Sequence, residues 1–316
     1  MSGEKSASQG RITLLQPGML WQRVKEQTEY ALTKQALLTI PTEFEFVEQD
    51  GVCFLVRVLS NLVRKDAAKK EQLKQIVRPG KEFNPFLPYE QDLFVADLSD
   101  THVCILNKYN VVDYHLLIIT RAFEEQESLL TLEDFAAVQA CLAEIDGLVF
   151  YNGGKVAGAS QRHKHLQLVP LPFIPSGSQI PIEPLLASAK FQSSITTIPR
   201  FPFVNAYTRL NVKNIESPLA TTEVTFECYR TLLKNVGIEN APGSENKQSA
   251  PYNLLVTRQW MLIVPRSQES FESISVNSLG FAGSLFVKNE QQMQLLKDIG
   301  PMTLLKKVAK SVSSEQ

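Results

Sequence analysis

The sequence predicts a protein of the α+β class, and three observations support that class. Segments with the spacing of strands and of helices are mixed along the 316 residues, without the regular strand–helix–strand alternation of a doubly wound fold. The apolar runs 103–106 and 116–119 are continuous, which is typical of strands covered on both faces. Two further apolar segments, 252–256 and 260–264, flank a polar tripeptide as in a β-hairpin.

The first half of the chain is expected to begin with a helix over 19–38, where apolar residues recur at helical spacing. Thr131 and Asp134 form the pattern of a capping box, which predicts a helix from there to about residue 147. The strands expected in this half are 44–47, 52–56, 94–96, 102–106, 114–120, 148–151 and 162–169.

The second half predicts a strand and then a helix within 203–237. One or two helices are expected over 290–311, interrupted at Gly300-Pro301, because proline breaks a helix. Residues 176–200 are rich in Ser, Pro and Thr, which predicts a linker or long loop. The expected organisation is therefore an N-terminal region 1–175, a linker or long loop 176–200, and a C-terminal region 201–316.

The composition excludes several classes of function. Apolar residues make up 44% and charged residues 21% of the chain, as in an ordinary globular protein rather than a disordered one. The 32 basic and 33 acidic side chains give a net charge of −1, which argues against general nucleic-acid binding. No apolar run approaches the ~18 residues of a membrane span. We expect a cytoplasmic protein without a secretory signal that binds neither nucleic acid nor membrane.

The four cysteines do not form a metal-binding pattern. They are widely separated, and no two of them form the CxxC pair on which many zinc sites are built. Free thiols in a reducing compartment are therefore expected at Cys53, Cys104, Cys141 and Cys228.

Two of the four histidines lie close together, in residues 162–169. Side chains alternate between the faces of a strand, so His163, His165 and Gln167 share one face and Lys164 lies on the other. A neutral imidazole can act as a nucleophile, and a hydrogen bond at one ring nitrogen fixes which nitrogen is free. The pair alone is equally compatible with a metal site or a polar surface.

The loop before this strand, residues 151–161, contains three glycines together with Asn152, Ser160 and Gln161. Glycine lets backbone N–H groups turn toward an anion, and amide and hydroxyl side chains add further donors. A glycine-rich loop alone is weak support, because most such loops are simple turns. A loop that runs directly into a His-x-His-x-Gln strand places phosphate donors beside a nucleophile for phosphorus.

Loop and strand together resemble the ATP adenylyltransferases, also called diadenosine tetraphosphate phosphorylases, of the histidine-triad superfamily. In their branch, shared with galactose-1-phosphate uridylyltransferase, His-x-His-x-Gln replaces the three-histidine motif. The resemblance covers roughly residues 20–310. It implies an antiparallel-rich sheet with flanking helices, and a C-terminal part that completes the nucleotide site. Further matching segments are 84–86, 107–112 with His115, 252–255, 260–261, 264–267, 277–283 and Lys288.

The resemblance also implies catalytic roles. His165, the second histidine of the motif, would attack the α-phosphorus of the nucleotide and form an adenylyl-histidine. His163 would shape the site and hold the tautomer of its neighbour through hydrogen bonds. Gln167 would contact the α-phosphate or the leaving oxygen.

Nucleotide-binding positions follow from the same resemblance. They are Lys65 (with Arg64 and Lys69 as close alternatives), Asn107, Lys108, Asn152, Gly158, Ala159, Ser160, Gln161, Asn277, Ser278, Leu279 and Lys288. A core position for Leu279 and solvated positions for Lys108 and Lys288 remain open, as does the role of Lys155. His115 would either back the site or be a satisfied core histidine, and His102 is expected to be structural or exposed.

The implied reaction is reversible phosphorolysis, in which diadenosine tetraphosphate and phosphate give ATP and ADP. Mg²⁺ would accompany the polyphosphate, because metal bridges neutralise phosphate charge, and no protein ligand set or organic cofactor is expected. The alternatives are a uridylyltransferase-like enzyme, an adenylylsulfate phosphorylase and a nucleotide-binding protein without turnover. The oligomeric state is not determined by the sequence.

Overall fold

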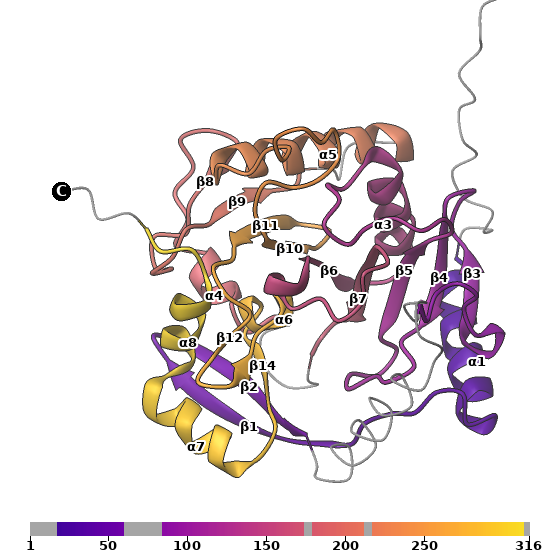
Figure 1. The fold of residues 1–316 in the computed structure, drawn as a ribbon, viewed down its shortest axis with the longest axis horizontal. Helices are drawn as coiled ribbons and strands as arrows, with labels where there is room; N and C mark the ends of the chain where they lie inside the picture. The colour runs from indigo at the N-terminus through magenta and orange to yellow at the C-terminus, as the bar shows by residue number, and fades with distance from the viewer. Residues whose placement is uncertain (1–17, 60–83, 174–178, 212–216, 313–316) are drawn as a thin grey trace, which may run out of the picture.

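A computed structural model describes residues 18–59, 84–173, 179–211 and 217–312 (Figure 1). Its main feature is a nine-stranded sheet in which every neighbouring pair of strands is antiparallel. The expected antiparallel-rich α+β fold is therefore confirmed. In spatial order the strands are β3 (Phe94–Asp97), β4 (His102–Leu106), β5 (Leu116–Thr120), β7 (His165–Pro170), β6 (Gly147–Gly153), β10 (Tyr252–Val256), β11 (Trp260–Pro265), β9 (Ala206–Arg209) and β8 (Ile195–Thr196).

One face of this sheet, here called the back face, is covered by helices. They are α1 (Leu20–Thr33), α3 (Leu132–Glu144) and α5 (Pro218–Asn235), and Figure 1 shows α3 and α5 lying above the sheet. Apolar side chains from these helices and from alternate strand positions, such as Leu166 and Leu168, form one core. The capping box predicted at Thr131 and Asp134 is present and begins α3.

The opposite face, here called the front face, is covered at one end by a second, three-stranded sheet. Its strands are β1 (Thr42–Gln49), β2 (Val52–Leu59) and β14 (Ser284–Val287), of which β14 runs parallel to β2. The helices α6 (Ser278–Phe281), α7 (Glu290–Ile299) and α8 (Pro301–Val308) complete this layer. Phe150 and Val169 of the large sheet belong to the core between the two sheets.

A small third cluster, formed by Phe86, Val103, Ile105, Leu117 and Ile119, covers the other end of the front face. Register places Ile119 opposite His165 and Leu117 opposite Gln167, and on the other side Phe150 lies opposite Gln167. Residues directly opposite each other share a face. The two motif side chains therefore lie on the front face, between the small cluster and the core of the second sheet.

Some predicted element boundaries are wrong. The first helix ends at Thr33 rather than near 38, because Gln35 adopts a left-handed φ of 57° and redirects the chain. The strand expected from 162 begins only at His165, and His163 makes an isolated bridge to Glu125.

Within the expected linker or long loop 176–200, the structure describes residues 179–200. They contain α4 (Glu183–Leu186) and β8, and Ile180, Ile182, Leu185 and Leu186 are buried in the core between the sheets. Short elements elsewhere are η1 (Gln91–Leu93), η2 (Lys155–Ala157), β12 (Ser270–Phe271) and β13 (Ile274–Ser275).

Helices in the described part of the chain all lack the length and apolar character that a membrane span requires.

Candidate active site

His165 is buried, with 4% of its surface exposed, and only one of its ring nitrogens has a hydrogen-bond partner among the described residues. Its Nδ1 lies 2.8 Å from the backbone carbonyl of His163, a pure acceptor, so Nδ1 carries the proton. Nε2 is then the unprotonated nitrogen, and no described residue forms a hydrogen bond with it. Burial lowers the pKa of His165 to about 4, so the ring is neutral at pH 7 and Nε2 has its lone pair available.

His163 is buried as well, but both of its ring nitrogens are occupied. Nε2 donates to the Thr120 carbonyl at 2.8 Å, and Nδ1 accepts from Asn84 Nδ2 at 3.0 Å. The amide of Asn84 is oriented for this by its Oδ1, which accepts from the Phe86 N–H. His163 therefore acts on His165 through its backbone carbonyl, while its ring fixes the position of the backbone. Burial lowers its pKa also.

Gln167 belongs to a chain of hydrogen bonds that begins at a backbone donor. The Tyr109 N–H donates to Asn107 Oδ1, so Asn107 Nδ2 faces His115 Nδ1 at 3.2 Å. His115 then carries its proton on Nε2 and donates to Gln167 Oε1 at 3.0 Å. The Gln167 amide N–H groups are the end left without a partner among the described residues. Burial lowers the pKa of His115 to about 4, so this histidine is neutral at pH 7.

Asn152 follows the same pattern on the neighbouring strand. It stands two residues beyond Phe150, on the front face, and is 2% exposed. Its Oδ1 accepts from the Ser278 N–H at 2.9 Å, from Ser278 Oγ at 2.8 Å and from Asn253 Nδ2 at 3.0 Å. The acceptor end is saturated, so the amide N–H groups of Asn152 are the end available to a ligand.

Gln126 separates β6 from β7 at the level of His165. Its Oε1 accepts from the His165 N–H at 2.9 Å, and its Nε2 reaches the carbonyls of Asn152 and His165 at 2.9 and 3.1 Å. The side chain thus replaces the ladder between the two strands just where the glycine loop leaves the sheet. Nothing in the sequence indicates this role, because Gln126 lies in an irregular polar segment without periodicity.

The predicted phosphate-binding loop is tightly wound. The N–H groups of Gly158 and Ala159 donate to carbonyls of Lys155 and Gly154 within the loop, whereas those of Ser160 and Gln161 have no partner among the described residues. Gly158 has a φ of 93°, and a Cβ there would lie 2.9 Å from the Cα of Asn277. The loop and the predicted segment 277–279 are therefore in direct contact.

The other predicted binding residues are less closely grouped. Ser278 and Leu279 are buried, and the Leu279 side chain lies in the core between the sheets. Lys108 makes an ion pair with Glu90, and Lys288 is exposed at the end of β14. Lys65, with its alternatives, lies outside the described residues. Nucleotide contact by these residues stays a prediction.

Directly behind the motif lies a cluster in which Lys164, Asp134 and His102 are buried and the Glu124 side chain is 43% exposed. The Lys164 ammonium is 2.5 Å from Asp134 Oδ2 and 2.9 Å from Glu124 Oε2, and His102 Nε2 is 2.9 Å from Asp134 Oδ1. Burial alone would raise the pKa of Asp134, but the hydrogen bond from His102 and the charge of Lys164 lower it overall. His102 is thus a buried structural residue, as expected.

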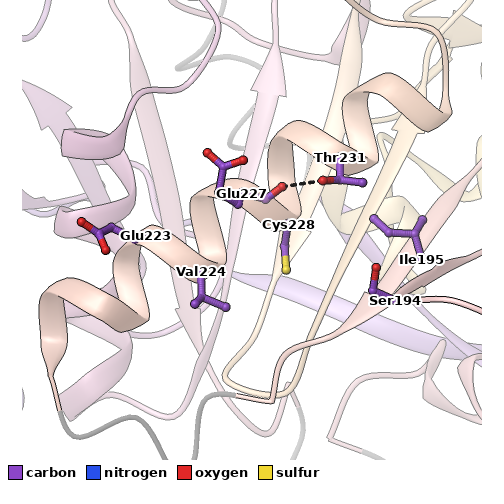
Figure 2. A pocket seen from close by; sticks show the side chains of 7 residues that line it. All are labelled: Ser194, Ile195, Glu223, Val224, Glu227, Cys228 and Thr231. Carbon is purple, nitrogen blue, oxygen red and sulfur yellow. Dashed lines mark hydrogen bonds between the residues drawn. The ribbon is translucent and has the colours of Figure 1, made fainter.

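A shallow apolar pocket lies elsewhere, between α5 and the segment at β8 (Figure 2). Its lining includes Ile195, Val224 and Cys228, with Glu223 and Glu227 on the same helix. None of the predicted site residues lines it, so it is separate from the motif.

The motif has the properties of a nucleotidyl-transfer site. A neutral nitrogen nucleophile is available at His165. The N–H groups of Gln167 and Asn152, which have no partner among the residues that the structure describes, can stabilise charge on phosphate oxygens. Such donors are effective because they are fixed before the ligand arrives.

Comparison with known proteins gives the family. A model of the Ap4A phosphorylase N-terminal domain matches residues 10–188, and a model of the ATP adenylyltransferase C-terminal domain matches residues 199–311. The chain therefore belongs to the Ap4A phosphorylase (ATP adenylyltransferase) family. Ap4A is the abbreviation of diadenosine tetraphosphate. The family expected from the His-x-His-x-Gln strand and its loop is confirmed.

Individual relatives agree. The chain is 27% identical over 241 residues to diadenosine 5',5'''-P1,P4-tetraphosphate phosphorylase 2 of Saccharomyces cerevisiae, covering 69% of this chain and 73% of that protein. The fold resembles the crystal structure of yeast Ap4A phosphorylase Apa2, with a TM-score of 0.74, 21% identity and coverage of 94% and 96% of the two chains. The Apa2 structure in complex with Ap4A gives a TM-score of 0.73 at 20% identity, covering 95% of this chain and 100% of that chain.

Proposed function

We propose that this protein splits Ap4A with phosphate to give ATP and ADP, and that His165 carries the adenylyl group between the two half-reactions. The observation that supports His165 is its single uncommitted nitrogen. Nε2 is unprotonated and unpaired among the described residues, while Nδ1 is held by the His163 carbonyl at 2.8 Å.

In the first half-reaction the Nε2 lone pair attacks the α-phosphorus at one end of Ap4A. The bond from that phosphorus to the bridging oxygen breaks, and ATP leaves with the electron pair. The ring becomes positively charged as the N–P bond forms, and the His163 carbonyl, which accepts from Nδ1–H, stabilises that charge.

In the second half-reaction a phosphate oxygen attacks the same phosphorus, the N–P bond breaks, and ADP leaves. His165 returns to its neutral form with its proton still on Nδ1. Gln167 and Asn152 donate to the non-bridging oxygens in both steps. In this proposal Mg²⁺ would arrive bound to the polyphosphate. It would neutralise part of the negative charge of the phosphates, because the donors of the front face carry no positive charge.

Intact-protein mass spectrometry tests the proposal. Wild-type protein mixed with Ap4A in the absence of phosphate should gain the mass of one adenylyl group, and phosphate should then release that group as ADP. His165→Ala should gain nothing, and its turnover should fall by more than about a thousandfold. Gln167→Ala is the matched control: it keeps the nucleophile and should reach the same adduct more slowly.

Two results would contradict the proposal. An adduct that persists in His165→Ala would place the nucleophile elsewhere. Bound nucleotide with no adduct in the wild type would identify a nucleotide-binding protein without turnover.

A further inference from the structure

Arg266 is a buried guanidinium whose hydrogen-bond acceptors among the described residues are all carbonyl or amide oxygens. It is 4% exposed and follows the end of β11. Nη1 lies 2.7 Å from Asn253 Oδ1 and 2.8 Å from the Val276 carbonyl, with the Ala157 carbonyl at 3.3 Å. Its other N–H groups bond the carbonyls of Val308, Gln268 and Glu269. None of the described carboxylates forms an ion pair with it. Its N–H groups are satisfied by fixed dipoles, the centroid of the Phe281 ring lies 5.4 Å from its guanidinium carbon, and the charge of Glu269 acts on it from a longer distance.

A guanidinium can only donate hydrogen bonds, and this sets the direction of the bonds that follow. Because Arg266 donates to Asn253 Oδ1, the Asn253 amide must present Nδ2 to its remaining neighbours. Nδ2 lies 3.0 Å from Asn152 Oδ1, 2.8 Å from Ser278 Oγ and 2.8 Å from the Ala157 carbonyl. Asn152 Oδ1 therefore accepts a hydrogen bond from Asn253 in addition to the one from the Ser278 N–H at 2.9 Å, and the N–H groups of Asn152 point away from this network.

The same guanidinium holds the two segments that meet beside Asn152. The Ala157 carbonyl directly precedes Gly158, and the Val276 carbonyl directly precedes Asn277. Gly158 and Asn277 are in direct contact, since a Cβ at Gly158 would lie 2.9 Å from the Cα of Asn277. One buried cation thus fixes both the loop and the amide on the front face.

We propose that Arg266 is a positioning residue for adenylyl transfer: through Asn253 it holds the Asn152 amide with its N–H groups turned toward the site next to His165. The inference rests on the proposed function, since the donors are needed by a phosphate that reacts at His165. Arg266 itself touches no reacting atom.

The decisive variant is Asn253→Asp. The new carboxylate still accepts from Arg266, but it presents an acceptor where Asn152 requires a donor. Either Asn152 Oδ1 then faces a carboxylate oxygen, which is a second acceptor, or the Asn152 amide rotates and its N–H groups no longer face the site. The expected result is a fall in kcat of about a hundredfold, as for loss of one preorganised donor, with KM changed much less. Arg266→Met should also lower kcat. Arg266→Lys, which keeps one hydrogen-bond donor, should lower kcat less than Arg266→Met does.

A double-mutant cycle separates positioning from general damage. In an Asn152→Ala background the donor is already gone, so Asn253→Asp and Arg266→Met should change kcat by no more than about threefold. Asn205→Asp is the matched control: Asn205 is 5% exposed and hydrogen-bonded to Ile198 and Phe203, away from the motif. It should lower the urea midpoint without lowering kcat.

The outcomes are distinct from those of the adduct experiment. If wild-type protein forms no adduct at His165, the proposed function fails first. If the adduct forms but Asn253→Asp lowers kcat equally with and without Asn152, Arg266 has only a structural role and the inference is wrong. Should Arg266→Met fail to fold in a urea titration, Asn253→Asp alone decides the question.

Discussion

The two faces of the sheet at the His163–Gln167 motif bury their polar groups in opposite ways. On the front face, His163, His165 and Gln167 are all neutral, and the pKa of His165 lies near 4. On the back face, Lys164 is charged, and Asp134 and Glu124 lie within 2.9 Å of its ammonium. Three consecutive residues of one chain segment thus belong to two different electrostatic environments.

The difference shows what each face can do. A buried charge needs an opposite charge or a full set of hydrogen bonds, and a charge satisfied in either way has no capacity left for a ligand. Neutral groups can be buried with one end hydrogen-bonded and the other end free. Within the part of the chain that the structure describes, this is the state of His165, Gln167 and Asn152. The front face can therefore bind an anion, whereas the back face fixes the segment in place. The variants proposed above test the front face, and the experiments below test the division between the two faces.

The largest effect below is expected from breaking the back face. Lys164→Met leaves Asp134 fully buried without its cation, and losing one partner of a buried pair costs about 3–5 kcal/mol in the free energy of unfolding. Urea denaturation measures this loss. Lys247→Met is the control, because Lys247 pairs with Glu127 at the surface, where both side chains are about half exposed. A loss below about 1 kcal/mol for Lys164→Met would mean that the back face is not held by this pair.

A pH titration of stability sharpens the comparison. The pKa values of His165 and His115 are about 4 in the folded protein, whereas an exposed histidine in the unfolded chain has the ordinary value of 6.5. Between these pH values the two histidines are protonated in the unfolded chain but not in the folded protein. The free energy of unfolding therefore falls as the pH drops from 6.5 toward 4. Each histidine accounts for about 3 kcal/mol of this loss. The pKa of Asp134 is lowered from 3.8, so the back face begins to weaken only below that window.

His115→Gln should remove about 3 kcal/mol of the loss between pH 6.5 and 4, because His165 and His163, whose pKa values burial also lowers, still contribute the rest. Urea titrations at several pH values measure it, with the wild type as reference. A wild-type stability that is flat over this window would contradict the neutral front face.

How far the sequence predicts this site depends on the kind of signal that each residue gives. The alternation of His163, His165 and Gln167 has period two, and the glycine loop precedes it directly, so both are visible in a short window. The same alternation predicts Lys164 on the other face, and its ion pair with Asp134 of α3 agrees with this. Its complete burial could not be predicted, because its partners Asp134 and Glu124 lie 30 and 40 residues earlier in the chain and lysine is rarely buried.

Gln126 and Arg266 show why the rest was missed. Gln126 inserts its amide between two strands from an irregular segment, and no local pattern reports such an insertion. Arg266 belongs to a segment that matches the family, but the direction of its hydrogen bonds depends on Asn253, Asn152 and Ser278, which converge only in the folded chain. Likewise Ile180 and Leu185 are apolar residues within a Ser- and Pro-rich stretch, and composition alone hides their burial.

The smallest effect is expected at Lys155, whose role the sequence left open. Its side chain is exposed, and it makes no hydrogen bond or ion pair with the described residues, although it lies within the glycine loop. Lys155→Ala should change the free energy of unfolding by no more than about 0.5 kcal/mol. Because the proposed phosphate donors are neutral and fixed, kcat/KM for Ap4A should change by no more than about twofold.

Gly158→Ala provides the contrast within the same loop. Its φ of 93° and the 2.9 Å approach to Asn277 leave no room for a methyl group, so activity should fall although no charge is changed. The two variants are compared by kcat/KM at low and high salt. A salt-dependent loss of about tenfold in Lys155→Ala would place this lysine on the phosphates, and the front face would then bind its anion with a mobile charge as well as with fixed neutral donors.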